Sequence, residues 1–251
     1  MRSLSMFAGG GIAETYFESA GIHVAVANEL LEERAAFHHF CHPEAKMICG
    51  DITDDSVFNH VVSSAKAAGV DFLMATPPCQ GMSTLGKKEY GTDARNELFW
   101  YAIKAIQEIE PDYALIENVP KFLKLLFTYD KEALSIVEIL KKSLGKIYTI
   151  EAEVLNAVHY GVPQSRPRAI IKLYKHGLSW AAPLKHEQVI SLKEAIGDLP
   201  PLEPGESSQL KWHSAVGYSS VQAEALRHTP EGQSALNNPV FYPKKKNGDR
   251  I

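Results

Sequence analysis

The chain has 251 residues, 45% hydrophobic and 22% charged, the composition of a soluble globular protein with room for one α/β domain and a small appendage. It has no apolar run of membrane-spanning length, no space for a signal peptide before its first strand-like segment, and three cysteines without a disulfide spacing, so we expect a cytoplasmic protein. The net charge of −4, divided as −6 over residues 1–150 and +2 over residues 151–251, argues against a uniformly basic nucleic-acid binder and predicts that a polyanion would contact local patches.

Strand-like and helix-like segments alternate along the first 174 residues. We expect strands at 3–7, 23–28, 46–49, 70–75, 113–116, 147–155 and 168–174. We expect helices at 12–20, 31–40, 54–68 and 95–109, with further helical segments across 121–143. This alternation predicts an α/β fold with a doubly wound, mostly parallel sheet and right-handed crossovers. Ligands of such sheets bind at the carboxyl ends of the strands.

The amino-acid composition of the sequence changes after residue 174. Prolines and glycines interrupt short segments, with one plausible helix near 191–196, and residues 205–251 are rich in Ser, Gln, Asn and Lys. We therefore predict a catalytic domain over residues 1–180, followed by an irregular C-terminal extension over residues 181–251.

A glycine turn, Gly9-Gly10-Gly11, joins the first strand to the next segment. Glu29 follows the second strand, 20 residues after Gly9, and Asp51 follows the third. Three glycines alone indicate only a tight turn, but with the two acids at neighbouring strand ends they favour a site for an adenosine-bearing ligand. Glu14 stands where a dinucleotide fingerprint has its third glycine, which favours S-adenosylmethionine over NAD and counts against a dehydrogenase.

Cys79 follows a short apolar strand and two prolines. Pro77 and Pro78 cannot donate to a strand ladder, and they hold the cysteine on a stiff turn before a polar, glycine-bearing loop that runs to Gly91. A buried structural cysteine is common, but a rigid base beside a mobile loop suits a nucleophile.

Glu117 ends the strand at 113–116, on the edge where Cys79 is expected. A thiolate that adds to C6 of a pyrimidine, with an acid at N3, makes C5 able to attack a sulfonium methyl group. Burial would raise the pKa of Glu117, and Arg166 or Arg168 could supply the positive field that lowers the pKa of the thiol.

These residues resemble the cytosine-C5 methyltransferases, in particular the DNA enzymes of bacterial restriction-modification systems, over residues 3 to 174. The matching motifs are Phe7-Ala8-Gly9-Gly10-Gly11, Glu29, Asp51-Ile52, Pro77-Pro78-Cys79-Gln80, Glu117-Asn118-Val119 and Gln164-Ser165-Arg166-Pro167-Arg168. The motifs of the nucleophile, the glutamate and the arginines occur in the order that the family has.

The resemblance implies a role for each of these residues. It implies that Cys79 is the nucleophile, that Glu117 binds N3 of the base, and that Arg166 and Arg168 support the base and the catalytic loop. It implies that S-adenosylmethionine is bound by Phe7, Ala8, Gly9, Gly11, Glu29, Asp51, Ile52 and Pro78, with Glu29 at the ribose and Asp51 and Ile52 at the adenine. The implied partner is double-stranded DNA, with the target cytosine flipped out of the helix.

The sequence departs from the family pattern in two places. Ile12 and Tyr16 stand where the family usually has glycines, and Tyr16 would be a pocket wall or narrow the cofactor site. The last two family motifs and most of the target-recognition domain have no counterpart. We therefore expect the larger subunit of a split enzyme or a truncated one, which would bind a second polypeptide through an apolar surface.

Several other interpretations stay open. His38, His39, Cys41 and His42 crowd the end of a helix, where a solvated helix end is favoured over a metal site, so we expect no metal. His159 could pair with Cys79 in a hydrolase, but that interpretation leaves the glycine turn unexplained. RNA instead of DNA as substrate, or a cofactor-binding subunit without activity of its own, are the remaining alternatives.

Overall fold

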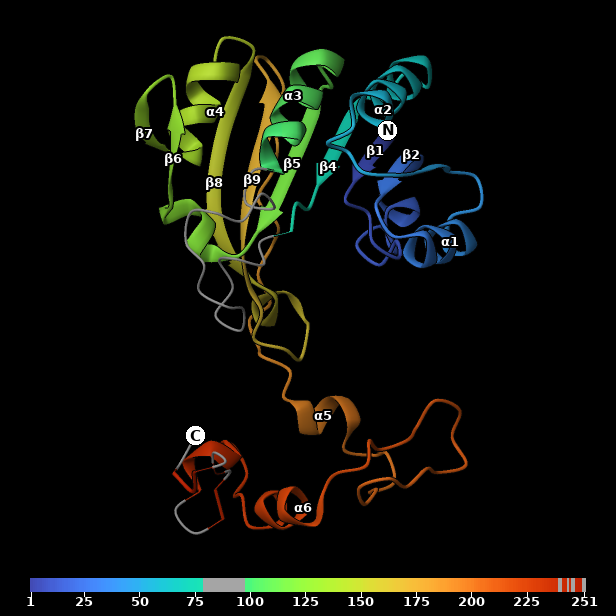
Figure 1. Ribbon diagram of the computed structural model, residues 1–251, viewed down its shortest axis with the longest axis vertical. Helices are drawn as coiled ribbons and strands as arrows, with labels where there is room; N and C mark the ends of the chain where they lie inside the picture. Colours follow the sequence, from blue (N-terminus) through green and yellow to red (C-terminus); the bar gives the residue numbers. More distant parts are fainter. Residues whose placement is uncertain (79–97, 239–240, 243, 245–246, 250–251) are drawn as a thin grey trace. The chain divides into compact units, whose positions relative to one another are not determined.

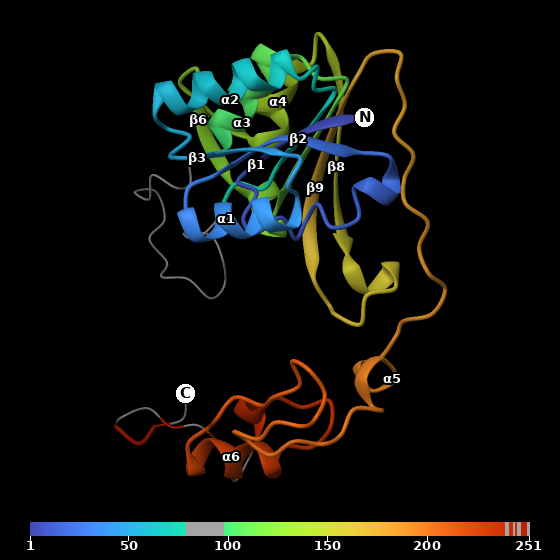
Figure 2. The same ribbon diagram turned by 90° about the vertical axis from the view of Figure 1, so that its right-hand side faces the viewer.

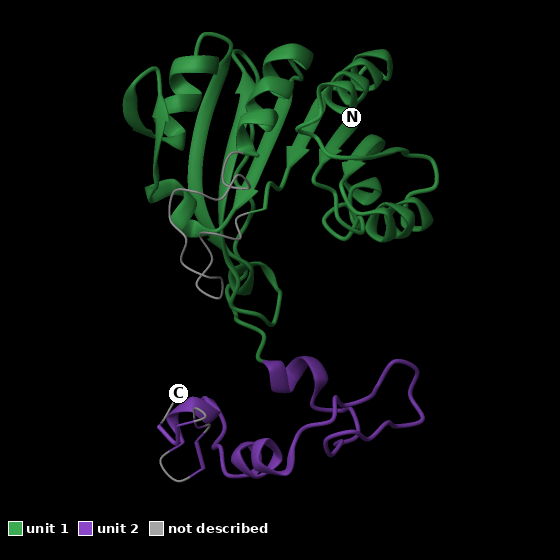
Figure 3. Cartoon of the chain, in the orientation of Figure 1, with its two compact units in different colours: residues 1–191 green, residues 192–251 purple. Residues whose placement is uncertain are grey.

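The computed structural model describes residues 1–78, 98–238, 241–242, 244 and 247–249. The chain forms two compact units, Met1–Ser191 and Leu192–Ile251 (Figure 3). Cys79, the loop predicted up to Gly91 and residues 95–97 of the predicted helix lie outside the described residues. Across the described part of the chain, no helix combines the length and apolar character needed to cross a membrane.

A seven-stranded sheet forms the centre of the first unit, in the order β3-β2-β1-β4-β5-β9-β8 (Figure 1). Its strands are β1 Arg2–Met6, β2 His23–Glu29, β3 Lys46–Cys49, β4 Phe72–Ala75, β5 Tyr113–Asn118, β8 Tyr148–Asn156 and β9 Pro167–Lys175. All neighbouring pairs from β3 to β5 are parallel, and only β9 runs antiparallel to its neighbours β5 and β8. The predicted doubly wound, mostly parallel sheet is confirmed.

Helices cover both faces of this sheet. The helices α2 Asp55–Ala67, α3 Phe99–Ile109 and α4 Ile136–Leu144 lie on one face, and α1 Glu32–Cys41 lies on the other (Figure 2). The larger core cluster packs apolar residues of α2, α3 and α4 against β1, β4, β5 and β9, whereas a smaller cluster lies at β2 under the opposite face. The sequence offers Asp54 or Asp55 as the N-cap of α2, and the cap is Asp54, whose carboxylate accepts hydrogen bonds from the backbone N–H groups of Ser56 and Val57.

The helix predicted at 12–20 is wrong. This segment is a series of turns, with only a short 3-10 helix, η1, at Glu18–Ala20. Ile12 and Tyr16, the apolar residues that suggested a helix face, are 76% and 79% exposed, while Glu14 is fully buried. An α-helix in a protein is stabilised mainly by an apolar face that packs, and this segment has none.

The helical interpretation of 121–143 is correct only at its ends. A 3-10 helix, η3 Pro120–Lys124, leads into a hairpin of β6 Leu126–Tyr129 and β7 Glu132–Ser135, and α4 follows. Asp130 and Lys131 connect the two strands with φ angles of 49° and 69°. Positive φ at both central residues is the geometry of a two-residue hairpin turn, which usually contains glycine or asparagine, so Asp-Lys gave little signal.

The second unit has short helices and long irregular segments. The helix predicted near 191–196 is confirmed as α5 Leu192–Ile196, and a 3-10 helix, η5, spans Ala235–Asn237. The helix α6 Ser220–Arg227 was not predicted, although Ser219 and Gln222 form a reciprocal capping box at its start. That spacing of Ser and Gln is a sequence signal for a helix start.

Candidate active site

The carboxyl ends of three parallel strands meet in register at one edge of the sheet. Met6 of β1 pairs with Ala75 of β4, and Ala75 pairs with Ile116 of β5. The next residues along these strands are Phe7, Thr76 and Glu117, which therefore lie at the same level, with Glu117 still paired to β9. The register brings the start of the glycine turn, the Thr76-Pro77-Pro78 segment and Glu117 to one edge, while Cys79 itself lies outside the described residues.

Side-chain hydrogen bonds tie these three strand ends together. The Thr76 hydroxyl donates to the carbonyl of Phe7 at 3.1 Å, and the buried Asn118 amide donates to the carbonyl of Pro77 at 3.2 Å. Asn118 also accepts at its side-chain oxygen from the backbone N–H of Val119. Sequence reasoning missed the roles of Thr76 and Asn118, although polar residues directly after two buried strands were a usable signal. The chain thus enters Pro78, and after it Cys79 outside the described residues, from a backbone fixed to β1 and β5.

Glu117 and Arg168 form an ion pair between β5 and β9. The two strands pair antiparallel as far as Asn118 and Ala169, which places Arg168 beside the end of β5. Arg168 Nε lies 2.8 Å from Glu117 Oε1, and the same guanidinium donates to the carbonyl of Pro167. The side chains of Glu117 and Arg168 are 28% and 26% exposed, so both remain accessible to a substrate.

Burial raises the pKa of Glu117 above its ordinary value, although Arg168 and Arg166 act in the opposite direction. A glutamic acid that keeps its proton to higher pH can donate it to a ring nitrogen. Arg166 lies nearby as a second positive charge, and its backbone N–H donates to the side chain of Asn156. The arrangement therefore combines an accessible acid with one cation, Arg168, that orients it and a second, Arg166, that adds positive charge.

The glycine turn after β1 contains backbone in the left-handed region. Phe7 has φ 59° and Gly9 has φ 57°, and an L-residue such as Phe7 rarely adopts that conformation outside constrained sites. The backbone N–H of Gly9 donates to Glu29 Oε2 at 2.8 Å. A Cβ placed on Gly9 would meet nothing within 4 Å. Gly9 thus presents open space beside a fixed backbone, as a ligand site requires.

The other two glycines of the turn have a different reason. A Cβ on Gly10 would lie 2.8 Å from Cδ1 of Phe37, and one on Gly11 would lie 2.7 Å from Cδ2 of His42. Both positions therefore need glycine because the turn packs closely on α1 and the residue that follows it. Ala8 is buried, and its N–H donates to the carbonyl of Asn28.

The acids predicted to hold a ribose and an adenine lie at the ends of β2 and β3. Glu29 is 6% exposed, and its two oxygens accept from the N–H groups of Gly9 and Leu31. Asp51 is exposed and accepts from the N–H and hydroxyl of Thr53. Ile52 is 4% exposed and belongs to the larger core cluster. Each carboxylate oxygen has a second lone pair, so Glu29 and Asp51 can still accept from a ligand while they hold the backbone.

The histidines at the end of α1 do not form a solvated helix end. His38 is completely buried, His42 is partly buried, and His39 and Cys41 are exposed. His38 and His42 lie close to the buried carboxyl group of Glu14. The run His38-His39-Phe40-Cys41-His42 does not itself show which of its members are buried, because that depends on what packs against α1.

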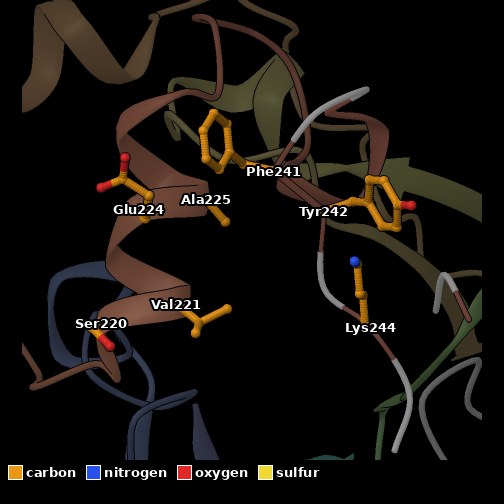
Figure 4. A pocket seen from close by; sticks show the side chains of 7 residues that line it. All are labelled: Ser220, Val221, Glu224, Ala225, Phe241, Tyr242 and Lys244. Atoms are coloured by element: carbon orange, nitrogen blue, oxygen red, sulfur yellow. The ribbon is translucent and has the colours of Figure 1, made fainter. Parts of the chain in front are cut away.

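The second unit has a cavity of its own, of about 630 Å³, between α6 and the chain that follows η5 (Figure 4). It is lined by Ser220, Val221, Glu224, Ala225, Phe241, Tyr242 and Lys244. None of these residues belongs to the predicted site.

The chain is similar to known methyltransferases. Residues 1–247 match the model of the family "C-5 cytosine-specific DNA methylase". The chain is 44% identical to the type II methyltransferase M1.HgaI of Avibacterium volantium, over 99% of this chain and 70% of that protein. It is 29% identical to the type II methyltransferase M1.HphI of Haemophilus parahaemolyticus, over 91% of this chain and 61% of that protein.

Solved structures share the fold. An E. coli protein crystallised as a candidate prophage-encoded DNA modification methyltransferase has a TM-score of 0.63 and 21% identity, over 84% of this chain and 58% of that chain. The DNMT2 mutant of Spodoptera frugiperda has a TM-score of 0.55 and 21% identity, over 76% of this chain and 54% of that chain. The chain thus spans between about half and 70% of the length of these proteins.

Proposed function

The chain belongs to the C-5 cytosine-specific DNA methylase family, and we propose that it transfers a methyl group from S-adenosylmethionine to C5 of a cytosine in duplex DNA. One observation carries this proposal beyond family membership. The Glu117–Arg168 pair lies next to Asn118, whose side chain holds the backbone of Pro77, two residues before Cys79. An acid and a cation thereby lie at the edge of the sheet from which the chain continues toward Cys79.

The ends of β1, β2 and β3 fit S-adenosylmethionine. The open space at Gly9 admits the methionine side of the ligand, beside Phe7, Ala8 and Gly11. Glu29 bonds to the same turn and could accept from ribose hydroxyl groups, while Asp51 and Ile52, which follow β3, are proposed for the adenine. We also propose Pro78 as a cofactor contact, since it follows β4 at the same edge. When bound, this cofactor supplies the methyl group on a positively charged sulfur.

In the proposed reaction, Cys79 forms a covalent bond from its Sγ atom to C6 of the cytosine. The electron pair of the C5–C6 double bond moves toward C5 as Glu117 donates a proton to N3. C5 then uses this electron pair to bond to the methyl carbon, while the sulfur–methyl bond breaks and its electron pair stays on the sulfur, which loses its positive charge. The proton on C5 leaves to a base, the bond between Sγ and C6 breaks, and Glu117 recovers its proton from N3. Covalent addition divides one difficult step into easier ones.

Arg168 acts by position and charge. Its Nε atom holds one oxygen of Glu117 at 2.8 Å, which leaves the second oxygen to face the base. Its charge also limits how far burial raises the pKa of Glu117. Arg166 adds a second positive charge and helps to stabilise the thiolate form of Cys79.

The ring face of a stacked cytosine is closed to a thiol, so we propose that the target base is flipped out of the duplex. A fluorescent base analogue at the target position should brighten when the chain and S-adenosylmethionine bind. A complex that methylates the DNA without any change of this signal would contradict base flipping.

The proposed function is tested by transfer of a labelled methyl group from S-adenosylmethionine. Mixed-sequence duplex DNA and RNA of the same sequence are the two substrates, and nucleosides are identified after digestion. We expect 5-methylcytosine in the DNA. Equal or greater labelling of the RNA, or a methyl group at another position of the base, would contradict the proposal.

A second polypeptide stays a prediction, and the similar proteins give it no support. The exposed apolar side chains that it could cover include those of Ile12, Tyr16 and Phe40, which are 76%, 79% and 79% exposed. The same assay tests it, with the chain alone and with a polypeptide that carries the C-terminal part of a type II relative. Robust, sequence-specific methylation by the chain alone would contradict the need for a partner.

A further inference from the structure

Three potential metal ligands converge behind the glycine turn, on the side of α1. Glu14 comes from the segment that follows β1, His38 from the last turn of α1, and His42 from the residue directly after that helix. One side-chain ligand atom from each lies within 4.8 Å of the other two. His38 and His42 are four residues apart, the spacing that places two side chains on the same helix face, and their ring centroids are 4.9 Å apart.

Burial leaves this cluster with polar atoms that have no partner. Glu14 and His38 are both 0% exposed. Among the described residues, Glu14 Oε2 and both ring nitrogens of His38 lack a hydrogen-bond partner. Buried polar side chains in folded proteins are nearly always satisfied, so three such atoms at one place indicate a missing species.

The contacts that do exist resemble the outer shell of a metal site. Glu14 Oε1 accepts a hydrogen bond from the hydroxyl of Ser5 on β1. His42 Nε2 lies 3.0 Å from the carbonyl oxygen of Gly11. Ligating carboxylates and imidazoles are typically fixed in this way by a second hydrogen bond to a hydroxyl or a backbone carbonyl.

The chemistry of the cluster favours a cation over water. Glu14 Oε2 and both ring nitrogens of His38 are buried without a hydrogen-bond partner among the described residues. A carboxylate oxygen and a neutral imidazole nitrogen can each donate a lone pair to a metal ion. Two imidazoles with one carboxylate suit Zn²⁺ and its neighbours in the first transition row, whereas Ca²⁺ and Mg²⁺ prefer oxygen ligands only.

The packing leaves room for the ligands to close on an ion. In a tetrahedral zinc site, bonds of about 2.1 Å place neighbouring ligand atoms about 3.4 Å apart, so the side chains need to move by little more than an ångström. Gly11 permits this approach, since a Cβ there would lie 2.7 Å from His42 Cδ2 and 3.1 Å from His38 Cδ2. The partial exposure of His42 gives the ion a path from solvent.

We propose that Glu14, His38 and His42 bind a divalent transition-metal ion, with Zn²⁺ the expected one, which joins the segment after β1 to the end of α1. We assign the ion a structural role, because two of its three ligands, Glu14 and His38, are fully buried and closed to a substrate. It reverses the sequence-based expectation of no metal. The proposal does not depend on the proposed methyl transfer, since it rests on residues outside that machinery.

The test uses the untagged full chain, stripped with a chelator and titrated with Co²⁺ as the probe. We expect one equivalent of Co²⁺ per chain, the visible absorption of a four-coordinate site, and displacement by one equivalent of Zn²⁺. X-ray absorption of the zinc-loaded wild-type chain should show scattering from two imidazoles. A wild-type chain that binds less than about a tenth of an equivalent, or a bound ion without imidazole scattering, would overturn the proposal and assign the cluster to ordered water.

Variants localise the site. Glu14→Gln and His38→Gln should each lower the affinity for Co²⁺ by at least about 100-fold. His39→Gln is the matched control, because His39 is the exposed neighbour on the same helix and its replacement should leave affinity unchanged. Zn²⁺ should raise the thermal midpoint of the wild type and of His39→Gln, but not of His38→Gln. Equal binding by His38→Gln and the wild type would overturn the assignment even if the titration of the wild type succeeds.

Discussion

At the β4–β5–β9 end of the sheet edge, Glu117 and Arg168 form an ion pair whose side chains are 28% and 26% exposed. At the β1–β2 end, Glu14 and His38 are fully buried. Within the described residues, Glu14 Oε2 and both ring nitrogens of His38 have no hydrogen-bond partner. A titratable group that has both a partner and an open side can exchange a proton with a substrate. A buried group without a partner instead needs an ion to complete it. We therefore propose proton transfer for the Glu117–Arg168 cluster and metal binding for the Glu14–His38 cluster.

Glu117→Gln should have the largest effect on this comparison. Glutamine keeps the shape and can accept from Arg168, but it has no proton to give to N3 of the base. Loss of general acid catalysis should lower the rate of methyl transfer by about 100-fold or more. Affinity for duplex DNA, measured by fluorescence anisotropy, should stay within a few-fold of the wild type. A variant that retains the wild-type rate would show that Glu117 is not the acid.

Arg168→Ala should act on the same step through Glu117. Without the cation, the pKa of Glu117 should rise further, because burial then acts with less opposition. The protonated acid is the active form, so the rate falls as pH rises through this pKa, and the falling limb should move to higher pH in the variant. The lost orientation of Glu117 should lower the maximal rate by about 10- to 100-fold.

Arg168→Lys is the control for this prediction. It retains the charge without the fixed geometry of the guanidinium, so its pH profile should stay near that of the wild type while its maximal rate falls. If the falling limb of the pH–rate profile stays at the same pH in Arg168→Ala, then Arg168 does not affect the pKa of the catalytic acid.

A matched pair of glycine substitutions tests the other end of the edge. Gly9 and Gly11 have φ angles of 57° and 78°, so alanine is strained at both, by about 1 kcal/mol of unfolding free energy. Only Gly11→Ala also places a Cβ against the ring of His42, so its total loss of unfolding free energy should be about 2–4 kcal/mol. Denaturant unfolding measures both variants. Gly9→Ala should lose more affinity for S-adenosylmethionine than Gly11→Ala does. If Gly11→Ala loses more affinity and Gly9→Ala more stability, then Gly9 does not border the ligand and Gly11 is not needed for packing.

Tyr148→Phe should have the smallest effect. Its buried hydroxyl donates to the carbonyl of Pro111 at 2.8 Å, remote in the sheet from the carboxyl edge. Loss of this hydrogen bond should lower the unfolding free energy by about 1–2 kcal/mol, with methyl transfer unchanged at a temperature where the variant is folded. A large loss of methyl transfer would show that a change at Tyr148 reaches the carboxyl edge of the sheet, which is not expected.

Sequence alone was informative where a local pattern and its burial agree. The bounds of β3 were predicted to the residue, because a short apolar run ends at Gly50, and Asp54 or Asp55 was expected to cap α2, as Asp54 does. Glu117 was predicted at the carboxyl edge of a parallel sheet, with Arg166 or Arg168 as the source of a positive field, and the structure has Glu117 at the end of β5 in an ion pair with Arg168.

The failures have physical causes. Ile12 and Tyr16 imitated an apolar helix face, but they point to solvent and the buried member of the segment is a carboxylic acid. The Asp130-Lys131 turn lacks the glycine that usually identifies a hairpin. The cluster of Glu14, His38 and His42 joins residues that are far apart in the chain, and no pattern of spacing reveals that contact. Tertiary packing decides all three.

Trapping the covalent adduct is the decisive test of the proposed catalysis through Cys79. Duplex DNA with 5-fluorocytosine is incubated with S-adenosylmethionine and the chain, alone and with a polypeptide that carries the C-terminal part of a type II relative. Fluorine at C5 cannot leave as a proton does, so the bond to C6 should persist. Mass spectrometry of the digested complex should place the DNA on Cys79, with none on the exposed cysteines Cys41 and Cys49. An equal yield with Cys79→Ser, attachment at another cysteine, or no adduct in either arm would contradict the account.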